Sequence, residues 1–276
     1  MTPILPSITR PSDMFTQLQK ILPKHLLSRL VGRLAASENR VIKTLFINLI
    51  CYFYPIDLEE AERPDRSDYQ SFNDFFTRSL KPDARPLHGR LSSPADGTVA
   101  ALGAIQENTL IQSKKHSYSV QELLADDTDD FANGSFITIY LAPHNYHRVH
   151  TPCAAELQRA AYIPGELFSV NQSTAENLPN LFARNERLVC RFDTDDGAMA
   201  QVLVGAMLVA GIKPVWLDSI YEPRLTATDN MQQSYKQGEE LAQFQMGSTV
   251  ILLFKTPLTF AFKQGDPIKV GQALTG

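Results

Sequence analysis

The pattern of apolar residues changes along the chain, and this change most constrains the fold. Before residue 60, apolar residues recur at helical spacing, whereas from Leu91 onward short runs rich in Val, Ile, Thr and Phe alternate with turn residues. The second pattern is typical of β-strands. We therefore predict an α+β fold in which N-terminal amphipathic helices precede a β-rich domain. The expected strands include Gly97–Ala100, Ser135–Tyr140, Ala200–Val204 and Ser248–Phe254, with one short helical piece at Val120–Ala125.

The length of 276 residues allows one large domain, or one domain with an appendage. Residues 55–90 are rich in proline and charge, which is typical of a connector. Within it lies an aromatic cluster, Phe72–Phe76, which we expect to pack inward because such clusters usually do. We place the boundary near residue 60, so that a helical segment (1–60) precedes the β-rich domain (61–276).

The first 43 residues carry a net charge of +5, although the whole chain carries −4. A basic start on an acidic body predicts an anionic surface as partner. We do not expect nucleic acid, because no basic or aromatic stripe continues through the acidic remainder. Apolar residues in the same region form two stripes at helical spacing, complemented by Lys24, Arg29 and Arg33; the stripes are Phe15, Leu18, Ile21, Leu22 and Leu26, Leu27, Leu30, Val31, Leu34.

Two interpretations of these stripes remain open from the residues alone. The helices could lie in a membrane interface, or they could pack on the protein's own core. The longest apolar stretch, Thr44–Pro55, is too short to span a bilayer. Residues Met1–Arg10 lack the apolar centre of a signal peptide, so we expect at most peripheral contact with a membrane.

Three short segments combine residue types that carry chemistry: Pro94–Thr98, His144–His150 and Met246–Thr249. Three of the six histidines fall in the second segment, at His144, His147 and His150. These histidines are spaced three residues apart. With this spacing, neither a strand nor a helix brings all three side chains to one face, so we expect no metal site. An imidazole that is neutral near pH 7 suits general acid or base catalysis instead.

Asp96 and Ser248 are ordinary residues when each is taken alone. Asp96-Gly97 is common turn chemistry, and Gly247-Ser248-Thr249 does not fit the G-x-S-x-G pattern of serine hydrolases. The set of an Asp, a His and a Ser on three segments of a β-rich fold is more informative, but chance can assemble such a trio from one sequence.

Six segments in order resemble the phosphatidylserine decarboxylases over most of the chain. Together they are specific, although each is weak alone. The family motif usually has Leu where this chain has Met246, and relatives often carry Arg-Asp in place of His144-Asn145. The matching segments are Phe72–Arg78, Pro94–Gly97, Tyr146–His150, Tyr162–Asn171, Leu181–Arg187 and Gly247–Val250.

The resemblance implies a pyruvoyl enzyme that matures by autocatalytic cleavage between Gly247 and Ser248. Ser248 would attack the carbonyl of Gly247, His150 would take its proton, and Asp96 would orient the imidazole and balance its charge. Elimination and hydrolysis would leave a pyruvoyl group at position 248. The large chain 1–247 and the small chain 248–276 would stay together, because the small chain begins with an apolar strand.

The resemblance also implies the reaction and its place. Phosphatidylserine would form a Schiff base with the pyruvoyl group and lose carbon dioxide to give phosphatidylethanolamine. His147 is the expected proton donor, and its role is not separable from that of His150 in the sequence. The basic helices would hold the enzyme peripherally on an anionic membrane, namely the cytoplasmic face of a bacterial inner membrane. Whether identical chains form a homo-oligomer is left open.

Three other functions compete with this one. A pyruvoyl decarboxylase of a soluble amino acid would not need residues 1–40 for vesicle binding. A non-catalytic lipid-binding module would show no turnover, although the intact Gly247-Ser248 argues against it. A serine hydrolase using the same triad would show esterase activity without cleaving itself.

Overall fold

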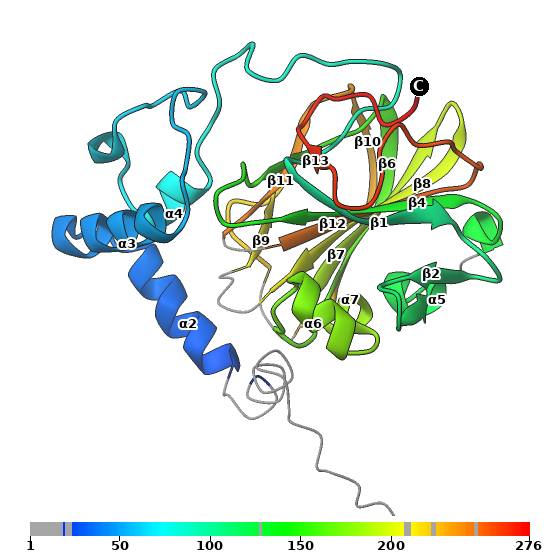
Figure 1. Ribbon diagram of the computed structural model, residues 1–276, viewed down its shortest axis with the longest axis horizontal. Coiled ribbons are helices and arrows are strands. Elements are labelled where there is room, and N and C mark those ends of the chain that lie inside the picture. The colour runs from blue at the N-terminus through cyan, green and yellow to red at the C-terminus, as the bar shows by residue number, and fades with distance from the viewer. Residues whose placement is uncertain (1–18, 20–23, 127–128, 207–210, 222–224, 246–247) are drawn as a thin grey trace, which may run out of the picture.

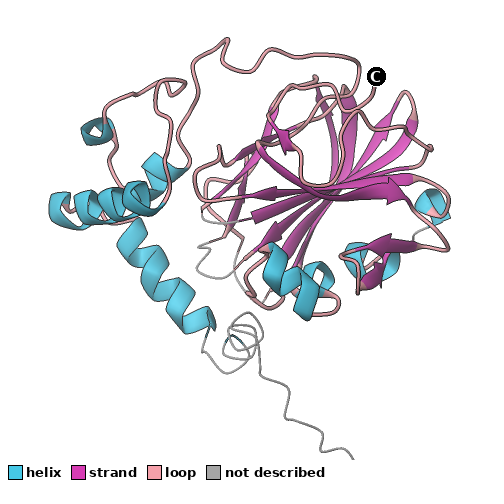
Figure 2. Cartoon of the chain, in the orientation of Figure 1, coloured by secondary structure: helices cyan, strands magenta, loops and turns pink. Residues whose placement is uncertain are grey.

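The computed structural model describes residues 19, 24–126, 129–206, 211–221, 225–245 and 248–276 (Figure 1). The expected stripe residues Phe15, Leu18, Ile21 and Leu22 lie outside the described residues, as does Gly247. Helices at the start of the chain are followed by a β-rich body with a few short helices (Figure 2), which confirms the α+β fold.

The helical part comprises α2 (Lys24–Ala35), α3 (Arg40–Phe53), a 3-10 turn (Arg66–Asp68) and α4 (Phe72–Phe76). Asn39 caps α3, because its Oδ1 accepts hydrogen bonds from the backbone amides of Val41 and Ile42. A separate apolar cluster holds these helices together: Ala35, Ile47, Tyr69, Phe72, Phe75 and Phe76. The inward packing predicted for Phe72–Phe76 is therefore confirmed, and the packing of the helical part extends beyond residue 60.

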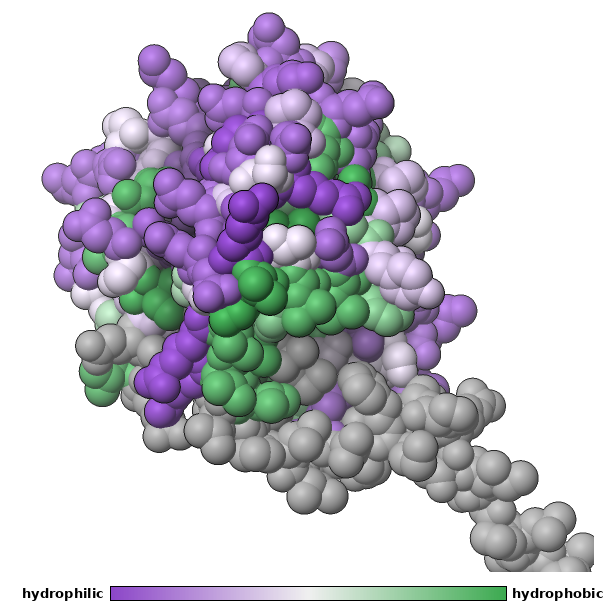
Figure 3. All heavy atoms as spheres, turned by 90° about the vertical axis from the view of Figure 1, so that its left-hand side faces the viewer, coloured by the Kyte–Doolittle hydropathy of each residue, from purple (hydrophilic) through white to green (hydrophobic). Residues whose placement is uncertain are grey.

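One face of the helical part leaves large apolar side chains exposed. Ile47 on α3 is buried, whereas other apolar residues of the same helix, spaced three or four residues apart, face outward. We call the exposed set the apolar helix face: Leu27, Leu30, Val41, Leu45, Leu49, Tyr52 and Phe53. Hydrophobic side chains gather on this side of the molecule (Figure 3). Within the described residues, no helix is both long and apolar enough to cross a bilayer.

The β-rich part is built on an eight-stranded antiparallel sheet in the order β10-β6-β7-β8-β12-β4-β1-β13. Its strands are β1 (Gly97–Ala104), β4 (Ser135–Leu141), β6 (Ala155–Ile163), β7 (Arg187–Thr194), β8 (Gly197–Gly205), β10 (Ala227–Tyr235), β12 (Ser248–Phe254) and β13 (Pro267–Ile268). The expected strands beginning near Gly97, Ser135, Ala200 and Ser248 are thus confirmed as β1, β4, β8 and β12.

Smaller elements cover the two faces of this sheet. Two further sheets are β5-β11-β9 and β2-β3. Their strands are β2 (Thr109–Ile111), β3 (Ser117–Ser119), β5 (Arg148–His150), β9 (Ile212–Pro214) and β11 (Glu240–Phe244). The short helical segments are α5 (Val120–Leu124), a 3-10 turn (Asp129–Phe131), α6 (Gln172–Asn177) and α7 (Leu181–Arg184), and α5 confirms the helical piece expected at Val120–Ala125.

Strand β12 lies in the middle of the large sheet between β8 and β4. All seven of its residues are buried, and their side chains alternate between two cores. Val250, Leu252 and Phe254 pack in the core shared with the three-stranded sheet, whereas Ile251 and Leu253 face the core that includes α5 and α7. Extraction of this strand would expose both cores to water, so it is firmly held.

Candidate functional site

The chain positions predicted from the sequence come together at the beginning of β12. Ser248 is its first residue and pairs with Leu141 at the end of β4. Residues 142–150 follow β4, and the amide of Phe244 donates to the carbonyl oxygen of His147 (3.0 Å). The amide of His150 donates to the carbonyl oxygen of Pro94 (2.9 Å), two residues before Asp96. Backbone pairing therefore links the histidine segment both to the segment around Asp96 and to the strands on either side of the Gly247–Ser248 bond.

The hydroxyl group of Ser248 is fully buried and makes no hydrogen bond within the described residues. A buried polar atom without a partner carries a free-energy cost, and native proteins rarely keep one without a reason. Its lone pairs are free to attack a neighbouring carbonyl carbon, so the site is compatible with a serine nucleophile.

His150 is held at both ring nitrogens. Nδ1 lies 2.9 Å from the carbonyl oxygen of Gly238, and Nε2 lies 3.0 Å from the hydroxyl oxygen of Tyr146. A carbonyl oxygen only accepts, so Nδ1 carries the hydrogen and Nε2 accepts from Tyr146. Burial lowers the pKa of His150, which keeps the ring neutral and able to accept a proton.

His147 is completely buried between the two parts of the molecule. Its ring lies against that of Phe76 on α4, with 4.0 Å between the ring centroids. Its Nδ1 donates to the carbonyl oxygen of Asn145 (2.9 Å), and its Nε2 has no partner within the described residues. Burial and the nearby Arg78 guanidinium lower the pKa of His147 to about 3. Nε2 is therefore a bare lone pair that can accept a proton.

Arg78 fixes the loop that carries His147. Its guanidinium donates to the carbonyl oxygens of His144 (3.0 Å) and Asn145 (3.3 Å), and Arg148 donates from Nε to the carbonyl oxygen of Thr77 (2.9 Å). The segment after α4 is thus hydrogen-bonded to the histidine segment from both directions. His144 contributes its backbone carbonyl to this contact.

Asp96 lies in the same region, but its carboxylate is not hydrogen-bonded to His150. Both oxygens accept from Arg85, at 3.1 Å from Nε and 2.6 Å from Nη2, and one also accepts from the amide of Val270 (2.8 Å). The hydrogen bond that we expected between Asp96 and the imidazole is not formed. Arg85 binds both oxygens of the Asp96 carboxylate, and the two ring nitrogens of His150 contact Gly238 and Tyr146 instead. The negative charges of Glu240 and, more weakly, Asp96 favour the protonated ring of His150, but burial outweighs them and its pKa is lowered.

Sequence reasoning missed three residues that shape this site: Tyr146, Arg85 and Phe76 in its contact with His147. Tyr146 lies four residues before His150 in the matching segment Tyr146–His150, and this proximity in the sequence could have indicated a contact between the two side chains. Arg85 lies in the proline-rich connector, where nothing in the sequence marks a buried ion pair. Within the described residues, no three His, Cys, Asp or Glu side chains are grouped so that they could hold a metal ion.

Comparison with known proteins shows which family the sequence of this chain matches. Residues 72–276 match the family model for phosphatidylserine decarboxylase, and residues 14–55 match a second model described as PSD. A phosphatidylserine decarboxylase proenzyme of Alcanivorax borkumensis is 47% identical, covering 93% of this chain and 94% of the relative. The proenzyme of Psychrobacter arcticus is 45% identical over 95% of this chain and 98% of its own length. The chain therefore belongs to the phosphatidylserine decarboxylase family.

Proposed function

We propose that this chain is the proenzyme of a phosphatidylserine decarboxylase, which cleaves itself between Gly247 and Ser248 and works on a membrane surface. Membership of the family supports the overall activity. The observation that carries the maturation step is the buried hydroxyl of Ser248 at the start of a central strand, which has no hydrogen-bond partner among the residues that the structure describes.

In the first step, the Oγ of Ser248 bonds to the carbonyl carbon of Gly247 and the C–N bond between the two residues breaks. The proton leaves Oγ for a base, and the freed nitrogen of Ser248 gains a proton. The product is an ester that links Gly247 to the side chain of Ser248. His150 is the proposed base, because its ring is neutral and Nε2 is the ring nitrogen without a hydrogen; Tyr146, which donates to Nε2, must release it as the proton is taken up.

Elimination then completes the cleavage. A base removes the α-hydrogen of residue 248, and the carboxylate of Gly247 leaves from the β-carbon. Water hydrolyses the resulting enamine in its imine form, which releases ammonia and leaves a pyruvoyl group as the first residue of chain 248–276. The residues present fit such a group, because position 248 lies at the end of a fully buried strand that holds the new terminus in place.

A pyruvoyl group supplies a ketone beside a carbonyl, which accepts the electron pair released when a carboxylate leaves as carbon dioxide. The residues of this chain move the proton. We propose that His147 relays a proton from water, through Nε2, to the substrate carbon. Because burial lowers the pKa of His147, its ring is neutral at rest with a bare lone pair at Nε2, and it carries the proton only in transit. Asp96 stabilises the positive charge on His150 during maturation.

The apolar helix face supports peripheral membrane binding. Its side chains lie on one side of α2 and α3 and are 36% to 83% exposed (Figure 3). Exposed apolar residues beside Arg29, Arg33 and Arg40 are typical of helices that lie in an anionic interface. We propose that this face inserts into the leaflet that contains phosphatidylserine, on the cytoplasmic side of the membrane.

The intact mass of the purified protein tests the maturation step. Wild type should give two chains, the smaller equal in mass to residues 248–276 with the N-terminal serine converted to pyruvoyl. The Ser248→Ala variant should stay a single chain. Release of carbon dioxide from phosphatidylserine vesicles by wild type alone would then establish the activity. A single full-length wild-type species after long incubation would contradict self-cleavage, and cleavage without turnover would contradict the decarboxylase assignment.

A further inference from the structure

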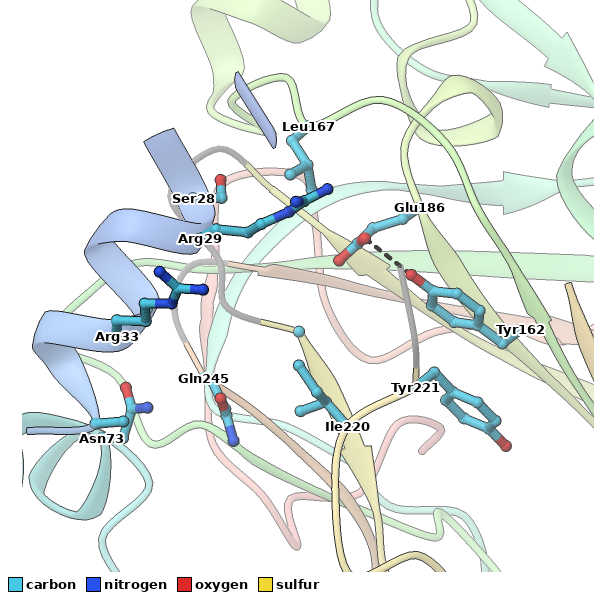
Figure 4. Close-up of a pocket in the computed structure, with 13 residues that line it drawn as sticks. Ser28, Arg29, Arg33, Asn73, Tyr162, Leu167, Glu186, Ile220, Tyr221 and Gln245 are labelled. Carbon is cyan, nitrogen blue, oxygen red and sulfur yellow. Dashed lines mark hydrogen bonds between the residues drawn. The ribbon is translucent and has the colours of Figure 1, made fainter. Parts of the chain in front are cut away.

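A cavity of about 410 Å³ lies between α2 and the β-rich part, next to the beginning of β12 (Figure 4). Arg29 and Arg33 line it from α2, Tyr162 and Glu186 line it from the large sheet, and Gln245 lies three residues before Ser248. One wall of the cavity is thus formed by the N-terminal helices, and another includes a residue close in sequence to Ser248. The steps proposed above do not use this cavity.

The α2 side of the cavity is cationic. Arg29 and Arg33 are four residues apart, so they lie on the same face of the helix, and their guanidinium groups extend toward the cavity (Figure 4). Neither forms an ion pair or a hydrogen bond within the described residues. Two unpaired guanidinium groups present the planar donors that bind phosphate oxygens most effectively.

The opposite side ends in a buried carboxyl group. Glu186 is 4% exposed, and its Oε2 accepts a hydrogen bond from the hydroxyl of Tyr162 (2.9 Å). A Cβ atom added at Gly205 would lie 2.9 Å from both Cγ and Oε1 of Glu186, so the Glu186 side chain lies over Gly205. Burial raises the pKa of this carboxyl.

The register of the sheet places Glu186 on the same side as the Ser248 hydroxyl. Gly205 pairs directly with Ser248 across β8 and β12. Directly paired residues of antiparallel strands project to the same face of the sheet, at one strand spacing. The direction from Gly205 toward Glu186 is therefore also the direction of the Ser248 side chain.

We infer that this cavity binds the headgroup of the phospholipid substrate, with its phosphodiester on Arg29 and Arg33 and its ammonium group on Glu186. This inference rests on the proposed function, because the ammonium group must lie where the amine can react at position 248. In a phosphoserine headgroup a short spacer separates the negative phosphate from the positive amine. The cavity presents the opposite charges in the same order, from α2 to β12.

The buried carboxyl also suits the amine chemically. An ammonium group must lose a proton before its nitrogen can attack a ketone. A carboxylate whose pKa is raised by burial can accept that proton. We therefore expect the proton to move from the ammonium group to Glu186, which leaves the nitrogen with a free lone pair. Tyr162 keeps the carboxyl oriented toward Gly205 through its hydrogen bond.

The first test uses the matured full-length enzyme and dihexanoyl phosphatidylserine below its micellar concentration, so that membrane binding plays no part. The variants are Arg29→Gln, Arg33→Gln and the double variant. Arg66→Gln is the matched control, since Arg66 is an exposed arginine of the 3-10 turn Arg66–Asp68 and does not line the cavity. We expect KM to rise on the order of tenfold for each cavity arginine, because each loses a charge-assisted hydrogen bond, and to stay near wild type for Arg66→Gln.

The second test separates the amine from the phosphate by competition. Dihexanoyl phosphatidylethanolamine and dihexanoyl phosphatidylethanol share the phosphodiester, but only the former carries an amine. Glu186→Gln keeps an oxygen for the Tyr162 hydrogen bond and should weaken inhibition by the ethanolamine lipid about tenfold, leaving inhibition by the ethanol lipid unchanged. The arginine variants should weaken both inhibitors.

The outcomes distinguish this inference from the proposed function. If the wild type neither cleaves nor releases carbon dioxide, the proposed function fails. If all variants mature by intact mass and the cavity arginines change KM no more than Arg66→Gln, the headgroup site fails while the function stands. Inhibition by inorganic phosphate as strong as that by phosphatidylethanol would also overturn a lipid headgroup site, and equal loss of both lipid inhibitors in Glu186→Gln would overturn the role of Glu186.

Discussion

Apolar side chains are distributed differently in the helical part (residues 24–78) and in the β-rich part (79–276). In α3, Ile47 is buried while Leu45 and Leu49 are 62% and 54% exposed. In β12, all seven residues are buried, and both faces of the strand are covered. An exposed apolar surface of this size is unusual on a soluble domain and indicates a partner. One part completes its packing internally, whereas the other leaves apolar side chains exposed, and these are the side chains that we propose to insert into lipid.

The two parts meet at the residues that we assign to chemistry. Phe76 on α4 lies against the ring of His147, and Arg78 holds the backbone of the preceding loop. The cavity between α2 and the large sheet lies on the same side. The helical part therefore forms one wall of the proposed site, in addition to carrying the apolar helix face.

The largest expected effect comes from the two histidines of the β-rich part. His147→Asn keeps a donor for the Asn145 carbonyl but removes Nε2, so it should mature normally and lose about 10²- to 10⁴-fold in turnover. His150→Asn should remain a single uncleaved chain. Intact mass and carbon dioxide release separate the two effects. Cleavage that fails in His147→Asn, or proceeds in His150→Asn, would contradict these assignments.

The sequence was sufficient for the division into helices and strands and for the residues around β12. Periodicity identifies strands such as Ser248–Phe254 because both faces are apolar. Periodicity does not show that Arg85 binds Asp96, because an ion pair between the connector and a turn produces no repeating pattern of residues in the sequence. Nor does it show that Phe76 lies against His147 or that Arg29 faces a cavity, since these contacts depend on how the helical part docks on the sheet.

A second comparison concerns two Arg–Asp pairs of similar geometry. Arg85 and Asp96 in the site are 10% and 7% exposed, whereas Arg63 and Asp74 in the helical part are 35% and 31% exposed. Asp96→Asn should lower the free energy of unfolding by about 3 kcal/mol, because a buried charge loses its partner and only Glu60 still faces Arg85. Asp74→Asn should cost at most about 1 kcal/mol.

Denaturant unfolding in the Ser248→Ala background checks this difference, because every variant then has the same uncleaved chain. Equal losses in the two variants would show that burial does not distinguish the pairs. A loss confined to Asp74→Asn would reverse the comparison.

The apolar helix face gives a smaller but selective effect. Leu45→Ser with Leu49→Ser should weaken binding to phosphatidylserine vesicles about tenfold to a hundredfold, because two side chains no longer leave water. Turnover of dihexanoyl phosphatidylserine should be unchanged. Leu225→Ser, which alters a 59% exposed leucine of the β-rich part, is the control. Vesicle sedimentation that shows the same loss for Leu225→Ser would contradict a specific membrane face.

The smallest expected effect concerns Glu60, which joins the connector to the β-rich part. Its carboxylate accepts from Arg85 (2.7 Å) and from Lys269 (2.9 Å), and the Arg85 contact is the main reason that its pKa is lowered to about 2. A carboxyl whose pKa is lower in the folded state stabilises the fold above its unfolded pKa, near 4.5, and loses this contribution as the pH falls toward 2.

Glu60→Gln should therefore lower the free energy of unfolding by about 1 kcal/mol at pH 7, since the group is partly exposed. The gap between variant and wild type should stay constant from pH 7 to pH 5 and narrow below pH 4.5. Unfolding curves of both proteins in the Ser248→Ala background across this range measure it. A gap that stays constant or widens as the pH falls would mean that the Glu60 carboxylate does not stabilise the fold through Arg85 and Lys269.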